Sequence, residues 1–124
     1  MLDAILGNAS KANNAQVQKQ HAAIFIPDET VEAAFRLVRD LIVFTNKRLI
    51  MIDVQGITGS KVEYLSVPYK SIRYFSVETA GRFDRDAELK IWVASGGGPT
   101  VSKQLKKGID IVSLQRTLAY FVLG

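Results

Sequence analysis

The stretch from Asp40 to Asp53, DLIVFTNKRLIMID, constrains the fold more than any other part of this 124-residue chain. Two apolar runs, Leu41–Phe44 and Leu49–Ile52, flank the polar patch Thr45–Arg48. Strands rich in branched and aromatic residues on either side of a short polar turn are typical of a tight β-hairpin. Asn46 tolerates the left-handed conformation that such turns often need. The conspicuous polar residues therefore lie where a turn requires them, which argues against an enzyme.

The β signal recurs along the chain from Thr30 onward. Short apolar runs are separated by turn signals such as Gln55-Gly56 and the glycines 96–98. In the first run, alternation predicts one shared face for Val31, Ala33, Phe35 and Leu37. The whole pattern predicts seven antiparallel strands, at residues 31–38, 41–45, 49–54, 61–67, 71–77, 88–94 and 100–106.

In the last segment, the apolar residues recur every three to four positions instead of every two, which indicates an amphipathic helix. The residues on its apolar face are Ile111, Leu114, Leu118, Phe121 and Val122. Asp110 precedes them and is a suitable N-cap, because its carboxylate can accept from unpaired amides of the first turn. Seven short strands leave the end of a barrel uncovered, so this helix is expected to cap it.

The N-terminal residues differ in pattern from the remainder. Residues 1–26 are expected to form a helical extension, and residues 27–124 the β-rich domain. Gly7 is expected to end one short helix and Ser10 to cap a second. The second helix has only Val17 and small alanines as apolar residues, so it can bury little surface by itself.

Composition limits the classes of protein that fit. The length is that of one domain, and a hydrophobic content of 48% is ordinary for a soluble globular chain. The absence of cysteine excludes disulfides, thiolate catalysis and zinc–sulfur sites. The apolar runs are far shorter than the roughly 20 residues that span a bilayer. No signal-peptide pattern opens the chain, so a cytoplasmic location is expected. The net charge of +4 forms no dense Lys/Arg stripe, so nucleic acid is not an expected partner.

The residue types that support catalysis are scattered. His21 is the single histidine, and no carboxylate lies near it in sequence to orient it as a general base. The acids of residues 84–88 alternate with arginine, which favours a self-neutralising loop over a metal site. The glycines 96–98 precede Pro99 and a strand rather than a helix, which indicates a turn and not a phosphate loop. We expect no catalytic residue, no cofactor and no metal.

Two surface features are candidates for binding. Trp92 is predicted on the strand face opposite Leu89 and Ile91. There its ring can serve either an oligomer interface or packing beneath a loop. Lys47 and Arg48 are candidate contacts for an anionic partner, although a turn by itself accounts for their position.

Several blocks of the sequence resemble one known family. The runs VFTNKRLIMID (43–53), VEYLSVPYKSIRYFSVETAG (62–81), FDRDAELKIW (83–92) and KKGIDI (106–111) resemble the bacterial pleckstrin-homology-like (PH) domain family, over residues 25–123. The resemblance implies a mostly β fold with α. It would be a partly open barrel of seven antiparallel strands in two near-orthogonal sheets, capped by a C-terminal helix and preceded by short N-terminal helices. It also implies a standalone cytoplasmic protein that forms a ring-shaped homo-oligomer, a pentamer, through exposed sheet edges.

Eukaryotic relatives of this fold bind phosphoinositide headgroups through basic residues between the first two strands. That loop is residues 38–40 here, with Arg39 beside an acid, and this departure argues against such a ligand. We therefore expect a non-enzymatic binding or scaffold module that self-assembles and has an unidentified protein partner.

The alternative is a peripheral membrane module. The N-terminal apolar residues Leu2, Ile5 and Leu6 would contact lipid while the basic body faces anionic headgroups. If the extension serves assembly instead, these same three residues are interface candidates.

Overall fold

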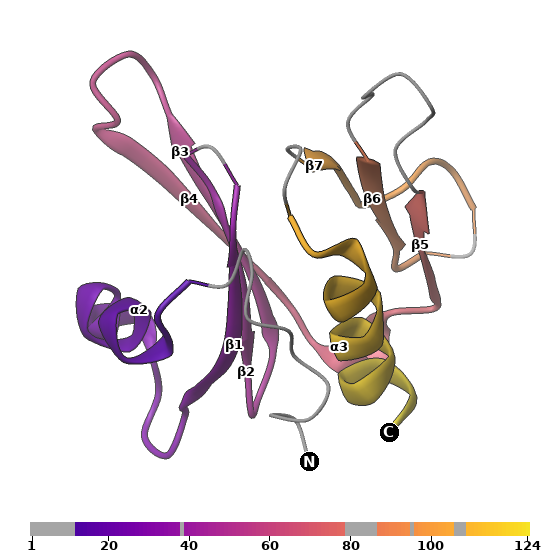
Figure 1. The fold of residues 1–124 in the computed structure, drawn as a ribbon, viewed down its shortest axis with the longest axis horizontal. Helices are drawn as coiled ribbons and strands as arrows, with labels where there is room; N and C mark the ends of the chain where they lie inside the picture. Colours follow the sequence, from indigo (N-terminus) through magenta and orange to yellow (C-terminus); the bar gives the residue numbers. More distant parts are fainter. Residues whose placement is uncertain (1–11, 38, 79–86, 95, 106–108) are drawn as a thin grey trace. The chain divides into compact units, whose positions relative to one another are not determined.

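The structure is a computed structural model that describes residues 12–37, 39–78, 87–94, 96–105 and 109–124 (Figure 1). The described residues up to Pro68 form one compact unit, and those from Tyr69 form a second. Each unit carries one antiparallel sheet, so the two are described in turn.

The first unit contains a four-stranded sheet of order β1-β2-β3-β4. Its elements are the helix α2 (Asn14–Gln20), the 3-10 helix η1 (Ala22–Ile24), and the strands β1 (Val31–Arg36), β2 (Leu41–Thr45), β3 (Leu49–Gln55) and β4 (Lys61–Val67). The predicted hairpin is confirmed, because β2 and β3 pair antiparallel with Phe44 opposite Leu49. In Figure 1, α2 lies beside β1, and the contacts between these two elements are extensive.

Both faces of this sheet are buried around β2, in which all five residues are buried. On one face, Val17 from α2 joins a cluster with Val43 and Ile50, each fully buried. On the other face, the rings of Phe35 and Phe44 meet edge to face, 6.0 Å apart. Helix α2 therefore buries its one large apolar residue, Val17, against the sheet. The helix is an integral layer of the unit.

The alternation predicted for the first strand is wrong at its start. The register of β1 against β2 shifts between Val31 and Ala33, which indicates a bulge. As a result, Val31 lies in the same cluster as Ala34, and Phe35 points to the opposite face. A bulge adds one residue to one strand only, so it reverses the alternation on one side of itself.

The N-terminal helices correspond only in part to the prediction. Helix α2 begins at Asn14, and its N-cap is Asn13, whose side-chain oxygen accepts from the Gln16 amide at 3.0 Å. The predicted cap at Ser10 is therefore wrong, since Ser10 lies well before the helix start. The first predicted helix, ending at Gly7, lies outside the described residues.

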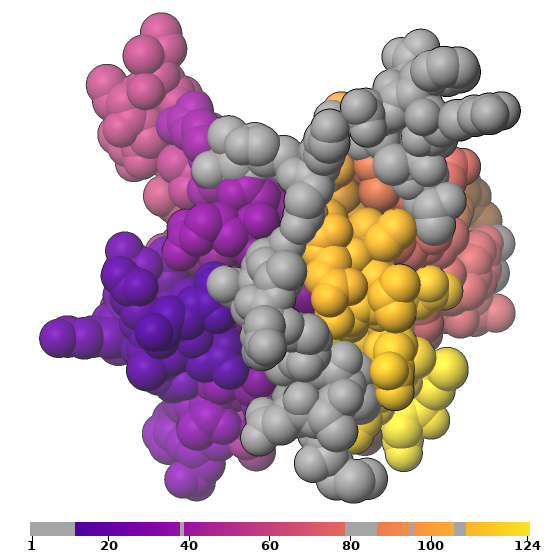
Figure 2. Space-filling model, viewed as in Figure 1, coloured from indigo at the N-terminus to yellow at the C-terminus, as the bar shows by residue number. Residues whose placement is uncertain are grey.

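The end of the β3–β4 hairpin extends beyond the neighbouring strands. β2 pairs with β3 only as far as Ile52, so Asp53–Gln55 pair with β4 alone. The hairpin closes with a turn in which the Gly59 amide donates to Gly56 O at 3.3 Å. Gly59 has φ +72, a backbone conformation that favours glycine, and an added Cβ would come within 3.3 Å of the Arg39 guanidinium. Figure 2 shows this hairpin end (pink) standing clear of the indigo α2.

The second unit contains a three-stranded sheet of order β5-β6-β7 and a helix. Its elements are the 3-10 helix η2 (Tyr69–Ser71), the strands β5 (Tyr74–Glu78), β6 (Ala87–Trp92) and β7 (Val101–Leu105), and the helix α3 (Ile111–Leu123). Along β6, buried and half-buried residues alternate. The predicted strand ends differ from the observed ones by up to three residues. The largest difference is at β5, which begins at Tyr74 because the 3-10 helix η2 occupies Tyr69–Ser71.

Helix α3 confirms the predicted cap and most of the predicted face. Asp110 is the N-cap, and its carboxylate accepts from the Ser113 amide at 3.0 Å. Leu114 and Leu118 are fully buried, whereas Phe121 is half-buried and stacks on Tyr69 with ring centroids 4.9 Å apart. The helix packs on η2 and β5 within its own unit.

Candidate functional site: a buried anchor and two unlike sheet edges

A tight turn at Ile26–Glu29 places a carboxylate in the interior of the first unit. The Glu29 amide donates to Ile26 O at 3.1 Å, which closes a four-residue turn. Pro27 occupies its second position, and Asp28 its third, with φ 66. Proline followed by a residue of positive φ is the pattern of a type II turn. The turn, here called the anchor turn, therefore places Glu29 directly before β1.

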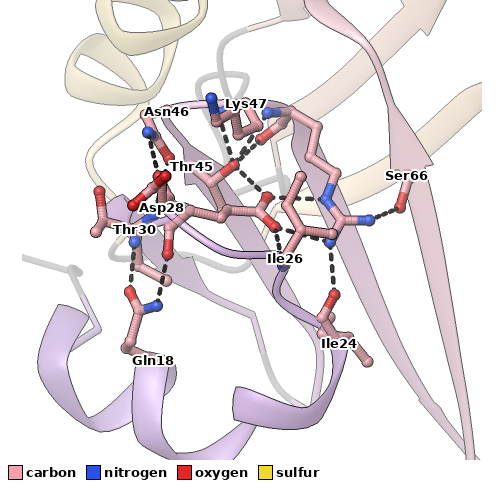
Figure 3. A network of polar contacts seen from close by, with 12 residues as sticks. Gln18, Ile24, Ile26, Asp28, Thr30, Thr45, Asn46, Lys47 and Ser66 are labelled. Atoms are coloured by element: carbon pink, nitrogen blue, oxygen red, sulfur yellow. Dashed lines mark hydrogen bonds and ion pairs between the residues drawn. The ribbon is translucent and has the colours of Figure 1, made fainter.

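Glu29 is 4% exposed and accepts from several donors of a dense polar network, in which Figure 3 labels the donor residues Ile26 and Thr45. Arg48 donates to both carboxylate oxygens, from Nε at 2.8 Å and from Nη2 at 2.9 Å. The Thr45 hydroxyl donates to the same carboxylate at 2.7 Å, and the Ile26 amide donates to it at 3.1 Å. A buried carboxylate with this many donors is fully satisfied, and its paired oxygens match the planar fork of arginine.

The charge states of this pair follow from the same contacts. Burial raises the pKa of Glu29, but hydrogen bonds from Arg48, Thr45 and Ile26 outweigh it and lower the pKa to about 2. The hydrogen bond to Glu29 raises the pKa of Arg48. Both groups are therefore charged across the physiological pH range. The Glu29–Arg48 pair, here called the anchor, has a structural role.

Arg48 connects this anchor to two further elements. Its Nη2 donates to Ile24 O at 2.7 Å, and its Nη1 donates to Ser66 Oγ on β4 at 2.8 Å. The Arg48 guanidinium thus has a structural role that the sequence did not predict, and its role as an anion contact stays a prediction. Lys47 beside it has an exposed side chain, and its role as an anion contact stays a prediction.

Asn46 does not use the left-handed conformation that it tolerates, since Asp28 is the one non-glycine residue of positive φ among the described residues. Instead, its side chain bridges to the segment before β1. Asn46 Oδ1 accepts from the Thr30 amide at 2.8 Å, and Nδ2 donates to Asp28 O at 2.8 Å. The residue that looked like a turn former therefore holds the anchor turn in place.

The outer edge of β1 is closed by the N-terminal segment. Three hydrogen bonds make this closure: from Ala12 N to Ala34 O at 2.9 Å, from Asn14 Nδ2 to Glu32 O at 2.9 Å, and from Val31 N to Gln18 Oε1 at 2.6 Å. Gln18 also donates from Nε2 to Glu29 O at 3.0 Å. An edge strand otherwise presents unpaired amides and carbonyls, so these side chains substitute for a neighbouring strand.

The outer edge of β4 has no comparable cover in the part of the chain that the structure describes. Within that part, the backbone of Lys61–Val67 makes no hydrogen bond beyond its ladder with β3. Five of its seven residues are exposed, including Val62 at 36% and Tyr64 at 39%. As far as the described ranges go, the same sheet therefore has one closed edge and one open edge.

His21, the C-cap of α2, contacts Tyr64 of β4. Its Nδ1 is 3.0 Å from the tyrosine hydroxyl, and the two rings meet edge to face. Burial, together with the charge of Arg36, lowers the pKa of His21. Among the described residues, no group of three or more histidines, aspartates or glutamates is arranged to hold a metal ion.

The second unit places Trp92 as predicted, on the face of β6 opposite the buried Leu89 and Ile91. Its ring stacks on Tyr74, the residue paired with it on β5, at 4.8 Å and 26°. Tyr74 is 51% exposed, so the two rings form an open aromatic pair. An interface role for Trp92 stays a prediction. The other interface candidates, Leu2, Ile5 and Leu6, lie outside the described residues.

The family model of the bacterial PH domain matches residues 1–122 of this chain. The chain belongs to the bacterial PH domain family. It is 60% identical over 118 residues to the uncharacterized protein YjqA of Bacillus subtilis (strain 168), covering 95% of this chain and 94% of that protein. It is 33% identical over 100 residues to the uncharacterized protein YozO of the same organism, covering 81% and 84% respectively.

Solved structures agree with this assignment. A pleckstrin homology domain from Shewanella amazonensis SB2B has a TM-score of 0.84 and 50% identity, covering 99% of this chain and 98% of that chain. A DUF1696 family protein with a pleckstrin-homology domain from Shewanella loihica PV-4 has a TM-score of 0.78 and 50% identity, covering 94% and 99%. The predicted PH-like fold is thereby confirmed, with seven antiparallel strands in two sheets, a C-terminal helix and a short N-terminal helix. None of the described helices has both the length and the apolar character needed to cross a bilayer.

Proposed function

We propose that this PH-like domain is a non-enzymatic binding and scaffold module that self-assembles into a ring-shaped homo-oligomer, with a pentamer as the expected size. The observation that carries the proposal is the contrast between the two edges of the four-stranded sheet: among the described residues, the outer edge of β4 has no cover, whereas the opposite edge, at β1, is closed. A strand of a second copy can pair with such an edge and satisfy its backbone groups.

Ring closure needs two different surfaces on each copy, because a contact between identical surfaces ends at a dimer. The open edge of β4 supplies one surface from the four-stranded sheet. The second surface is an outer strand of the three-stranded sheet, either β5 or β7. Repetition around a ring then gives weak individual binding sites a high effective concentration, which is the property of a scaffold.

The absence of cysteine from the chain allows a direct test of this pairing. Glu63→Cys on β4 is mixed with either Ser76→Cys on β5 or Ser102→Cys on β7, and each mixture is oxidised. Heterologous pairing predicts a disulfide between the two different variants in one of these mixtures. A cross-link that forms only between two Glu63→Cys copies would instead indicate a symmetric dimer and exclude the ring.

The size of the unmodified assembly is the second measurement. Native mass spectrometry and light scattering at micromolar concentration are expected to show one closed species larger than a dimer. A monomer across this concentration range would overturn the proposed function. Glu63→Cys alone under reducing conditions serves as the control for the effect of the substitution.

A further inference from the structure

We infer that residues 12–20, here called the guard segment, close the β1 edge so that the four-stranded sheet offers a second copy only one docking strand, β4. Release of the guard segment uncovers β1 as a second docking strand on the same sheet. The inference rests on the proposed function for its assembly readout, but the closure itself rests on contacts within one unit.

The guard segment uses both side chains and backbone to imitate a neighbouring strand. The Ala12 amide donates to Ala34 O, as a paired strand would. Further along β1, Asn14 Nδ2 and Gln18 Oε1 take over the donor and acceptor roles. Together the guard segment supplies two donors and one acceptor along this edge, so a strand of another copy would have to displace all three to pair there.

Two further contacts hold the guard segment in place. Val17, between the two polar residues that contact β1, is fully buried in the cluster under the sheet. Gln18 donates to Glu29 O, so the segment is also attached to the anchor turn. The bulge in β1 adds a third obstacle, because an irregular edge pairs poorly with a regular strand.

The consequence is a restriction on how copies combine. If both β1 and β4 were open, β4 of one copy could pair with β1 of the next, in competition with the contact proposed for the ring. A head-to-tail contact closes into a ring only where its rotation closes, and a second such contact with a different rotation would let the sheets join into open-ended assemblies. The guard segment removes this mode and leaves β4 for the contact that closes.

The test is the double variant Asn14→Ala/Gln18→Ala, which removes the side-chain bonds to β1 but retains Val17. Sedimentation velocity over a concentration series is expected to show species roughly twofold or more larger than the unmodified assembly, growing with concentration. The matched control is Gln16→Ala/Gln20→Ala, which truncates two exposed residues of the same helix and is expected to leave the size unchanged.

Amide hydrogen exchange verifies that the closure has been released. The Val31 amide, which donates to Gln18 Oε1, is expected to exchange faster in the double variant. Gln18→Glu keeps an acceptor oxygen and is expected to retain most of this protection, whereas Gln18→Ala is not. If the double variant does not fold, these two single variants carry the same comparison.

The possible results affect the two proposals differently. Faster exchange at Val31 with an unchanged assembly size would overturn the guard function, whatever the unmodified size is. A monomeric unmodified protein whose double variant associates would overturn the proposed ring and support the guard segment. A larger assembly in the double variant, with an unchanged control, supports both.

Discussion

The two sheets of this domain bury their strands in different ways. All five residues of β2 are buried, whereas buried and half-buried residues alternate along β6. Their sequences, LIVFT and AELKIW, already show this difference, because a strand covered on both faces has no polar face to alternate with. The first sheet is therefore a core layer that leaves mainly its edges for contact. The second keeps one face partly open, where Trp92 and Tyr74 stack.

The two units also differ in how they hold their carboxylate anchors. Glu29 is buried and accepts from four donor groups, two of them on one arginine. Asp110 is half-buried and accepts from the amide and hydroxyl of one neighbour, Ser113. The first anchor links distant segments, and the second orders only the start of a helix. Their removal should accordingly have very different effects on stability.

The largest effect is expected from Arg48→Ala. This change leaves the Glu29 carboxylate buried without its charged partner and should lower the free energy of unfolding by about 3 to 5 kcal/mol. Urea denaturation followed by circular dichroism measures it. The neighbouring variant Lys47→Ala, at an exposed side chain, should stay within about 0.5 kcal/mol of the unmodified protein. Similar losses for both variants would show that the anchor is not a special feature of the first unit.

A second pair of truncations compares the sheets directly. Ile50 is fully buried in the cluster with Val17 of α2. Ile50→Ala should lower the free energy of unfolding by about 3 kcal/mol, because a cavity replaces the side chain. Trp92→Ala on the open face of β6 should cost about 1 kcal/mol, mostly through loss of stacking on Tyr74. Denaturant midpoints of the two variants give the comparison. If Trp92→Ala proves the more destabilising, the face assigned as open is covered.

The pH dependence of stability separates the two anchors without relying on truncation. Folding lowers the pKa of Glu29 from 4.5 to about 2, so the folded chain binds fewer protons there than the unfolded chain. This contribution is present in full above pH 4.5 and is lost as the pH falls towards 2. It amounts to about 3 kcal/mol at most.

Glu29→Gln should remove this part of the acid dependence, because the amide does not titrate. The measurement is the free energy of unfolding of both proteins between pH 6 and about 2, compared as a difference curve. A difference curve that is flat below pH 4.5 would mean that the carboxylate is no better stabilised in the folded state than in the unfolded state.

Much of the fold could be predicted because its signals are local. The presence of the seven strands, the cap at Asp110 and the position of Trp92 on the face opposite Leu89 depend on residues close in sequence, and each is confirmed. The bulge near Val31 could not be found in this way, because it appears only when the strand is paired with its neighbour. Ser10 and Asn13 are both good helix caps by residue type, so the sequence alone favoured the wrong one.

The anchor was missed for a different reason. Glu29 and Arg48 are 19 positions apart, and nothing in either local sequence says that they meet. The turn that brings them together depends on Asp28, whose positive φ could have been suspected from the preceding proline. The closure of β1 by Asn14 and Gln18 was equally hidden, because a polar helix usually indicates solvent exposure. Long-range polar contacts leave little trace in the periodicity of a single sequence.

A smaller effect is expected at the second anchor. Asp110→Ala removes the N-cap of α3 and should cost about 1 kcal/mol. Ser113 donates to the Asp110 carboxylate through both its amide and its hydroxyl. The hydrogen bond from the amide makes the largest contribution to the lowered pKa of Asp110. Asp110→Ser, which keeps an acceptor for that amide, should recover most of the loss in thermal or urea denaturation. A cost as large as that of Arg48→Ala would erase the distinction between the two anchors.

The smallest effect distinguishes two exposed acids of the first unit by backbone conformation alone. Asp28 has φ 66 in the anchor turn, a conformation that glycine adopts without strain, so Asp28→Gly should raise the free energy of unfolding by about 0.5 kcal/mol. Glu63 lies in the extended strand β4, where the same change to glycine should lower it by about 0.5 to 1 kcal/mol. Because both side chains are exposed, opposite signs in parallel urea titrations can come only from the backbone. If both variants have a lower free energy of unfolding, the Asp28 side chain stabilises the turn by more than the strain that its positive φ costs.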